Sequence, residues 1–181
     1  VLNVAAAARR YARHWNRAGD FIARNCGDLG VGDVAVNQLG RRDRIVCQLR
    51  RAHATRRNAD VNVAARACGL ANRAFELGVD YAQQRVTFGK PIAEHQAVAF
   101  RLAAMATKVE AAHLMMVKAA RMKDSGERND MEAGMAKYLA SEYCKEVVED
   151  SFRIHGGYGY SKEYEIERLY REAPMLMIGE G

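Results

Sequence analysis

The sequence predicts an all-α protein, an up-and-down four-helix bundle that follows a poorly ordered N-terminal leader. Two observations support this prediction. From residue 61 onward, apolar residues recur at steps of four and three, which is the period of one face of an α-helix. Polar and glycine-rich breaks divide this pattern into three long segments and one short one, and no segment alternates as a strand would. Long amphipathic helices joined by short loops pack as antiparallel neighbours.

Residues 1–57 form the predicted leader, and their composition sets them apart from residues 58–181, the predicted helical domain. They contain twelve arginines and four aspartates but neither lysine nor glutamate, so they carry more positive charge than the whole chain, whose net charge is +6. Three interpretations remain open: a translated segment never optimised as a protein surface, a loosely ordered natural leader, or a patch that binds nucleic acid through its phosphates. We favour the first and do not expect nucleic acid as a partner.

The first two helices are predicted from their apolar stripes. The first stripe consists of Val63, Ala67, Leu70, Ala74, Leu77 and Tyr81. A break follows at Thr87 to Pro91, where glycine and proline favour a turn. The second stripe consists of Val98, Leu102, Met105, Val109, Ala112 and Met116. Both stripes lie on one side of a helix and should face the core.

The third and fourth helices follow breaks at residues 124–128 and 156–159. The third stripe consists of Ala136, Ala140, Tyr143, Val147, Ser151 and Ile154. Its helix begins with a predicted capping box, in which the side chains of Asn129 and Glu132 each satisfy a free backbone donor. The fourth helix is predicted from Glu163 to Glu172, ending before Pro174 because proline lacks a backbone N–H.

The composition limits the classes of protein. The chain has 181 residues, 49% of them hydrophobic, which is enough for one core of ordinary size. It contains neither a continuous apolar stretch of membrane-spanning length nor a signal sequence, so we expect a cytoplasmic protein. The four cysteines, Cys26, Cys47, Cys68 and Cys144, are far apart and indicate neither a zinc site nor a disulfide framework. We expect them to be reduced, with Cys68 and Cys144 facing the core.

Three motifs stand at the ends of the predicted helices. Residues 81–96 read YAQQRVTFGKPIAEHQ, residues 154–160 read IHGGYGY, and residues 178–181 read IGEG. In this order and spacing they resemble the C-terminal helical domain of the acyl-CoA dehydrogenases, which are FAD-dependent flavoproteins. The resemblance covers residues from about 61 to 181 and implies a truncated chain, with one of the three domains of the family.

The resemblance implies a set of cofactor-binding residues. Arg85 would reach the diphosphate of an FAD held mainly by a neighbouring subunit, a role that suits the paired donors of a guanidinium. Gly156 and Gly157 would let the backbone approach the adenosine half of FAD. Arg153 stands where the family commonly has glutamine, so it would bond a phosphate with a different geometry. The companion positions along the same dinucleotide are Thr87, Phe88, His95 and Gln96.

These residues also have purely structural interpretations. A cation such as Arg85 at a helix C-terminus complements the negative end of the helix dipole. Glycines such as Gly156 commonly cap a helix because they tolerate positive φ. The residue patterns alone leave both alternatives open.

Glu180 is the catalytic residue that the resemblance implies. In the family, a Glu-Gly pair after an R-x-Y-R-x-A segment supplies the base, and here Glu180-Gly181 follows RLYREA at residues 168–173. The α-proton of an acyl thioester is weakly acidic, so its removal needs a fixed, partly desolvated carboxylate. Some members carry the base near Ala59 or Asp60 instead. Because Ala59 cannot serve as a base, the sequence favours Glu180 and a straight short-to-medium acyl chain.

The resemblance therefore implies a flavin oxidoreductase of fatty acid metabolism that acts on acyl-CoA. Its expected partners are a homo-oligomer or a related full-length subunit, and an electron-transferring flavoprotein. Because two family domains are absent, activity of the chain by itself is an open question. The alternative is a non-catalytic helical remnant or oligomerisation module. A visible-absorbance scan would separate the two, because bound flavin gives a yellow protein.

Overall fold

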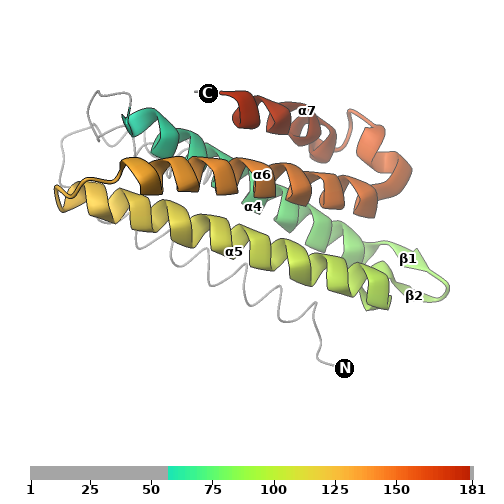
Figure 1. Ribbon diagram of the computed structural model, residues 1–181. Helices are drawn as coiled ribbons and strands as arrows, with labels where there is room; N and C mark the ends of the chain where they lie inside the picture. Colours follow the sequence, from blue (N-terminus) through green and yellow to red (C-terminus); the bar gives the residue numbers. More distant parts are fainter. Residues whose placement is uncertain (1–56, 180–181) are drawn as a thin grey trace, which may run out of the picture.

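The computed structural model describes residues 57–179 (Figure 1). Nearly all of the predicted leader, with Cys26 and Cys47, lies outside these residues, as do Glu180 and Gly181. Successive helices run in alternating directions, which confirms the predicted up-and-down four-helix bundle. The helices are α4 (Arg57–Gln84), α5 (Gln96–Asp124), α6 (Asp130–His155) and α7 (Glu165–Ile178). Within the described residues, none of them is both long and apolar enough to cross a membrane.

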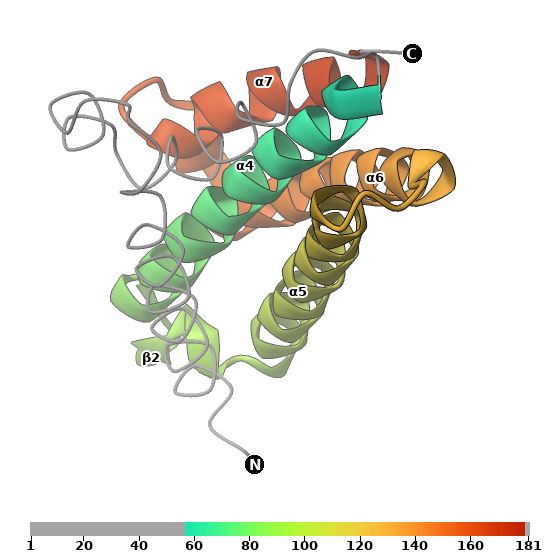
Figure 2. The same cartoon turned by 90° about the vertical axis from the view of Figure 1, so that its left-hand side faces the viewer.

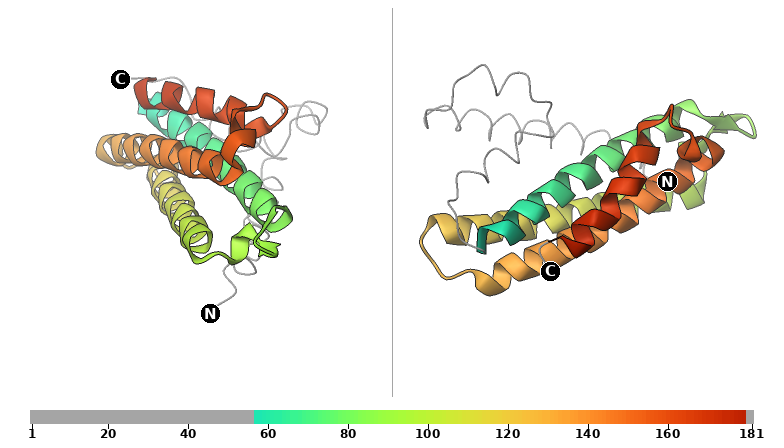
Figure 3. Two further views of the ribbon diagram at one scale, coloured as in Figure 1. Left: turned by 90° about the vertical axis from the view of Figure 1, so that its right-hand side faces the viewer. Right: turned by 90° about the horizontal axis from the view of Figure 1, so that it is seen from above.

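The helices are arranged in three layers. The helices α4 and α6 lie side by side in the centre, with α5 against one side of the pair and α7 against the other (Figures 1, 2 and 3). Every residue of the three predicted stripes is buried or half-buried, as expected. Cys68 and Cys144 are fully buried free thiols, which confirms their predicted orientation. Burial raises the pKa of Cys68 to about 12, so this thiol stays protonated.

A short hairpin connects α4 to α5. It consists of β1 (Val86–Thr87) and β2 (Lys90–Pro91), is followed by the 3₁₀ helix η2 (Ile92–Glu94), and turns at Phe88 and Gly89. These two residues have φ angles of 51° and 79°, the conformation of a type I′ turn. The sequence predicted the break but not the strands, because two residues are too few to show alternation. A second 3₁₀ helix, η3 (Gly156–Tyr160), connects α6 to α7.

The predicted end of the fourth helix was wrong, because α7 continues through Pro174 to Ile178. An interior proline removes one backbone hydrogen bond and costs a helix about 3 kcal/mol. The buried face of α7 extends past the proline, since Ala173 and Leu176 are both buried. Packing of this face against α4 and α6 therefore outweighs the local preference to stop.

The predicted capping box at the start of α6 was also wrong. Asn129 makes no side-chain hydrogen bond to the first turn of α6. Its amide Nδ2 instead donates to the carbonyl oxygen of Ala119 on α5, at 2.9 Å, and the residue is buried. The amide therefore ties α6 to α5, and its orientation is set by this contact between helices.

Gly159 in η3 allows a close approach that any side chain would block. A Cβ at this position would lie 2.8 Å from the carbonyl oxygen of Phe152. We expect Gly159→Ala to lower the free energy of unfolding in urea by about 1–3 kcal/mol, because backbone must move. Gly134→Ala is the matched control, since no atom lies within 4 Å of its added Cβ, and it should stabilise α6 by about 0.5–1 kcal/mol. Equal losses in both variants would contradict this reading.

Candidate functional site

An open groove of about 490 Å³ lies where α4 enters the hairpin and α6 enters η3. Both junctions are at the same end of the bundle, on the right in Figure 1. The groove is lined by Arg85 and Thr87 from the first junction and by Gly156 and Gly157 from the second. The structure thus brings together four of the predicted cofactor residues from two distant parts of the sequence.

Arg85 is placed by the end of α4 and the base of the hairpin. Its backbone N–H donates to Tyr81 at 2.9 Å, and its carbonyl accepts from Ile92 at 2.8 Å. Its guanidinium lies 6.0 Å from the centroid of the Tyr158 ring, a cation–π distance. No ion pair among residues 57–179 includes Arg85. Its exposed guanidinium therefore retains N–H groups for an anion.

The hairpin links the other residues of the first motif. Thr87 Oγ1 and His95 Nε2 are hydrogen-bonded at 3.1 Å. The ring of Phe88 meets that of His95 edge to face at 6.1 Å, yet Phe88 is 97% exposed at the hairpin tip. Gln96 begins α5 and is exposed. Phe88, His95 and Gln96 lie along the hairpin and its exit, outside the wall of the groove.

The glycine pair closes α6 and leaves space in front of its backbone. Gly156 has φ of 59°, and its N–H donates to the carbonyl of Arg153. Apart from the adjoining residues of the chain, no atom of the residues that the structure describes lies within 4 Å of a Cβ built on Gly156 or Gly157. A ligand can therefore approach this backbone closely, a use of glycine that the cap alone does not require.

His155 and Tyr81 also line the groove, although the sequence reasoning assigned them no site role. The Nδ1 of His155 donates to the carbonyl of Ser151 at 2.7 Å, because a carbonyl oxygen can only accept. Burial lowers the pKa of His155, so the imidazole is neutral near pH 7 and Nε2 is an acceptor. Its ring stacks on Tyr81 at 4.4 Å. The only sequence signal was their position within or beside the two motifs.

Arg153, another predicted residue, lies away from the groove. The Nε of Arg153 donates to Glu149 Oε1 at 2.8 Å along the surface of α6, and the residue does not line the groove. Glu180 is outside the described residues. The helix that precedes it, α7, ends beside the middle of α6 and well away from the groove (Figure 1). No group of three metal-ligating side chains occurs in the part of the chain that the structure describes.

The fold and the groove together define a class of protein. It is an antiparallel helical domain that carries, at one end, a hairpin beginning directly after Arg85 and a turn that contains Gly156 and Gly157. The family profile described as "Acyl-CoA dehydrogenase, C-terminal domain" matches residues 50–181, beginning eight residues before the predicted boundary at residue 58. The chain therefore belongs to the acyl-CoA dehydrogenase family and corresponds to its C-terminal domain. Proteins of this family are flavoproteins, typically with FAD.

Individual relatives agree with this assignment. The 3-(aryl)acrylate reductase of Clostridium sporogenes is 50% identical over 121 residues, which cover 67% of this chain and 32% of that protein. The caffeyl-CoA reductase-Etf complex subunit CarC of Acetobacterium woodii is 41% identical over 154 residues, covering 85% of this chain and 41% of that protein. The structure of butyryl-CoA dehydrogenase from Megasphaera elsdenii has a TM-score of 0.68 at 37% identity, covering 77% of this chain and 34% of that chain. The chain thus spans less than half the length of these relatives.

Proposed function

We propose that this chain is the C-terminal part of an acyl-CoA dehydrogenase-type flavin oxidoreductase, and that its groove binds part of an FAD held mainly by a second subunit. The observation that carries the proposal is the meeting of Arg85 with Gly156 and Gly157 in one open groove. A guanidinium that forms no ion pair with residues 57–179, together with an open glycine backbone, suits a diphosphate and the nucleoside beside it.

Other groups of the groove would orient the dinucleotide. The neutral His155 offers an acceptor at Nε2, and Thr87 offers a hydroxyl already oriented by His95. The Tyr158 ring beneath the Arg85 guanidinium holds the cation at the groove while leaving its N–H edges available. The groove is open on one side, so a second protein surface is needed to enclose a cofactor.

The catalytic base belongs to a different place in the molecule. We assign that role to Glu180, which follows the end of α7, and α7 ends far from the groove (Figure 1). The groove would therefore complete the cofactor site of one subunit, while Glu180 would serve a second site. There its carboxylate would take the α-proton of an acyl-CoA, and the flavin, when bound, supplies hydride chemistry at the β-carbon.

The carboxylate chemistry bears on the direction of the reaction, and the names of two relatives bear on the redox partner. A carboxylate that removes the α-proton in dehydrogenation returns it in reduction, so one site serves both directions. Both of these relatives, which are described above, are named as reductases, one of them as a subunit of a reductase-Etf complex. An electron-transferring flavoprotein is accordingly the redox partner that we propose.

Titration with FAD tests the groove. We expect the full chain to bind FAD weakly, without saturation at low micromolar cofactor, because the groove provides one wall only. Arg85→Ala should weaken this binding by about 1.5–3 kcal/mol, the range for a hydrogen bond to a charged group. Quenching of flavin fluorescence measures the FAD affinity of the parent chain and of the Arg85→Ala variant. Arg66→Ala, which removes an exposed arginine from α4, is the control. Tight stoichiometric binding, or equal losses in both variants, would refute the one-sided site.

A non-catalytic oligomerisation module is the second candidate. It is favoured by the side chain of Phe88, which the hairpin holds almost fully exposed although it is apolar. A visible-absorbance difference spectrum, recorded between FAD mixed with the purified chain and the same concentration of FAD alone, distinguishes the two functions. Failure to take up any flavin, in a chain that still self-associates, would support the module and exclude the oxidoreductase domain.

A further inference from the structure

Lys137 on α6 has an unusual position for a charged residue. Among residues 59–179, whose side chains the structure describes, it is the one lysine or arginine that is buried, with 8% of it exposed. Ala133 and Ser141, one helical turn before and after it, are buried as well, so Lys137 lies on the inner face of α6. Removing an ammonium group from water is unfavourable unless a partner compensates.

The end of α7 is one compensating partner of Lys137. The Nζ of Lys137 donates to the carbonyl oxygen of Met177 at 3.0 Å. The last carbonyls of a helix have no donor within the helix, and cations near them are stabilising. No basic residue of α7 lies in its own last turn. The helix α6 thus supplies through Lys137 the cation that caps α7.

The last turn of α7 depends on this cap because the turn before it is weakened. Pro174 has no N–H to donate to the carbonyl of Tyr170. Beyond the proline, the N–H of Gly179 donates to Met175 at 2.9 Å, and Gly179 then adopts an extended conformation. The contact of Lys137 with Met177 is therefore made where the chain leaves the helix.

We propose that Lys137 is a positioning residue that fixes where and in which direction the chain leaves α7. Glu180 follows Met177 by three residues, a length of chain that spans at most about 11 Å. Holding the carbonyl of Met177 therefore limits where the Glu180 carboxylate can act. The part of the proposal that concerns Glu180 rests on the proposed function, whereas the contact that caps α7 does not.

Hydrogen–deuterium exchange of the full chain tests the cap. Lys137→Met keeps an unbranched side chain, one heavy atom shorter, and removes its donor, so amides at the end of α7 should exchange about tenfold faster or more. The exchange of the amides of α4 and α5 should be unchanged.

Lys145→Met, at an exposed position of α6, is the control. Lys137→Arg should restore slow exchange, because a guanidinium also donates to a carbonyl. If Lys137→Met does not fold, Lys137→Ala replaces it, because alanine also has no side-chain donor. Equal exchange in the Lys137 and Lys145 variants would overturn the cap.

Activity tests the positioning role. In the full chain fused to the N-terminal and middle domains of a relative, Lys137→Met should lower kcat at least tenfold. The KM for acyl-CoA and the FAD content should stay within twofold, and Lys137→Arg should recover part of kcat. Faster exchange at the end of α7 with unchanged kcat would overturn the positioning role. Full activity of the same fusion with Glu180→Gln would instead refute the proposed base, and the exchange result would still decide whether the cap exists.

Discussion

Glu180→Gln is expected to lower the kcat for acyl-CoA oxidation by about 10²- to 10⁴-fold in a complete enzyme built around this domain. That enzyme consists of this chain fused in frame to the N-terminal and middle domains and the following C-terminal segment of a relative. Glutamine keeps the shape of the side chain and removes only the basic oxygen, so FAD should remain bound. Acyl-CoA-dependent reduction of a dye acceptor measures the rate, and the flavin absorbance measures the bound cofactor.

The matched control for this prediction is Glu163→Gln, which changes an exposed carboxylate before α7 and should leave kcat unchanged. The chain without the added domains should reduce no dye above background, because it lacks the rest of the site. A Glu180→Gln fusion that turns over as fast as its parent would show that the base lies elsewhere.

Phe75→Ala is expected to lower the free energy of unfolding by about 3–5 kcal/mol, the range for removing a buried phenyl ring. Phe75 is on α4, the central helix that contacts each of the other three, and none of its surface is exposed. The loss combines the transfer of the ring to water with the cavity left between rigid helices. Urea unfolding followed by circular dichroism measures it.

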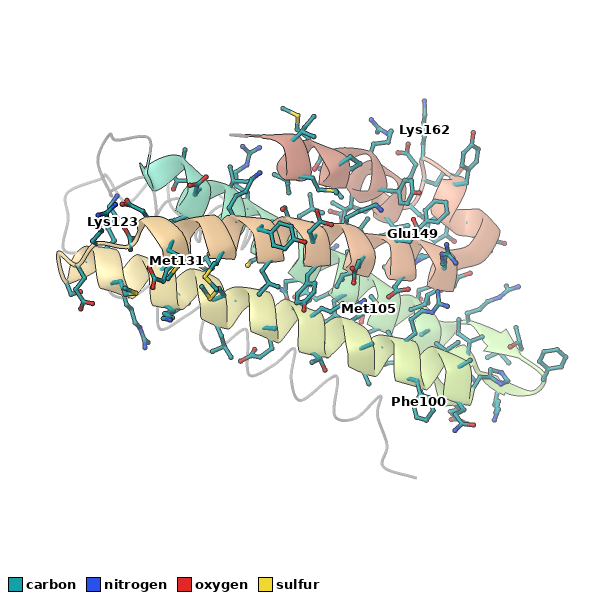
Figure 4. All side chains as sticks on the ribbon, in the orientation of Figure 1. Phe100, Met105, Lys123, Met131, Glu149 and Lys162 are labelled. Carbon is teal, nitrogen blue, oxygen red and sulfur yellow. The ribbon has the colours of Figure 1, made fainter. Side chains whose placement is uncertain are left out.

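Phe100→Ala is the control for this core substitution. Phe100 is on α5, is 62% exposed, and points away from the other helices (Figure 4). Its removal should change the free energy of unfolding by no more than about 0.5 kcal/mol. Similar losses for Phe75 and Phe100 would mean that the bundle is packed differently from the structure described above.

The bundle could be predicted from the sequence because burial acts on one face of each helix. Val63 and Ala67 on α4, or Leu102 and Met105 on α5, are spaced by the helix itself, so their pattern needs no knowledge of what covers them. Both halves of the groove could also be recognised in the sequence as motifs. One motif contains Arg85, and the other contains Gly156 and Gly157. Their meeting depends on how α4 and α6 pack, and the resemblance to a family, not periodicity, predicted that they act together.

Three features that sequence reasoning missed depend on contacts between different helices. Asn129 bonds to α5 instead of capping α6, and Pro174 is held in a helix by the apolar residues around it. Lys137 shows no distinguishing pattern in the sequence, since its partner is a backbone carbonyl forty positions away. Arg153 was assigned by analogy with a glutamine, but a guanidinium finds a closer partner in Glu149, one turn away on the same helix.

The open side of the groove has a consequence for the behaviour of the protein on dilution. If one wall of the cofactor site comes from each of two subunits, cofactor binding and subunit association are thermodynamically linked. Each event then increases the equilibrium constant of the other by the same factor. The fraction of protein carrying flavin should consequently rise with protein concentration at constant free FAD, and flavin should dissociate when the subunits separate.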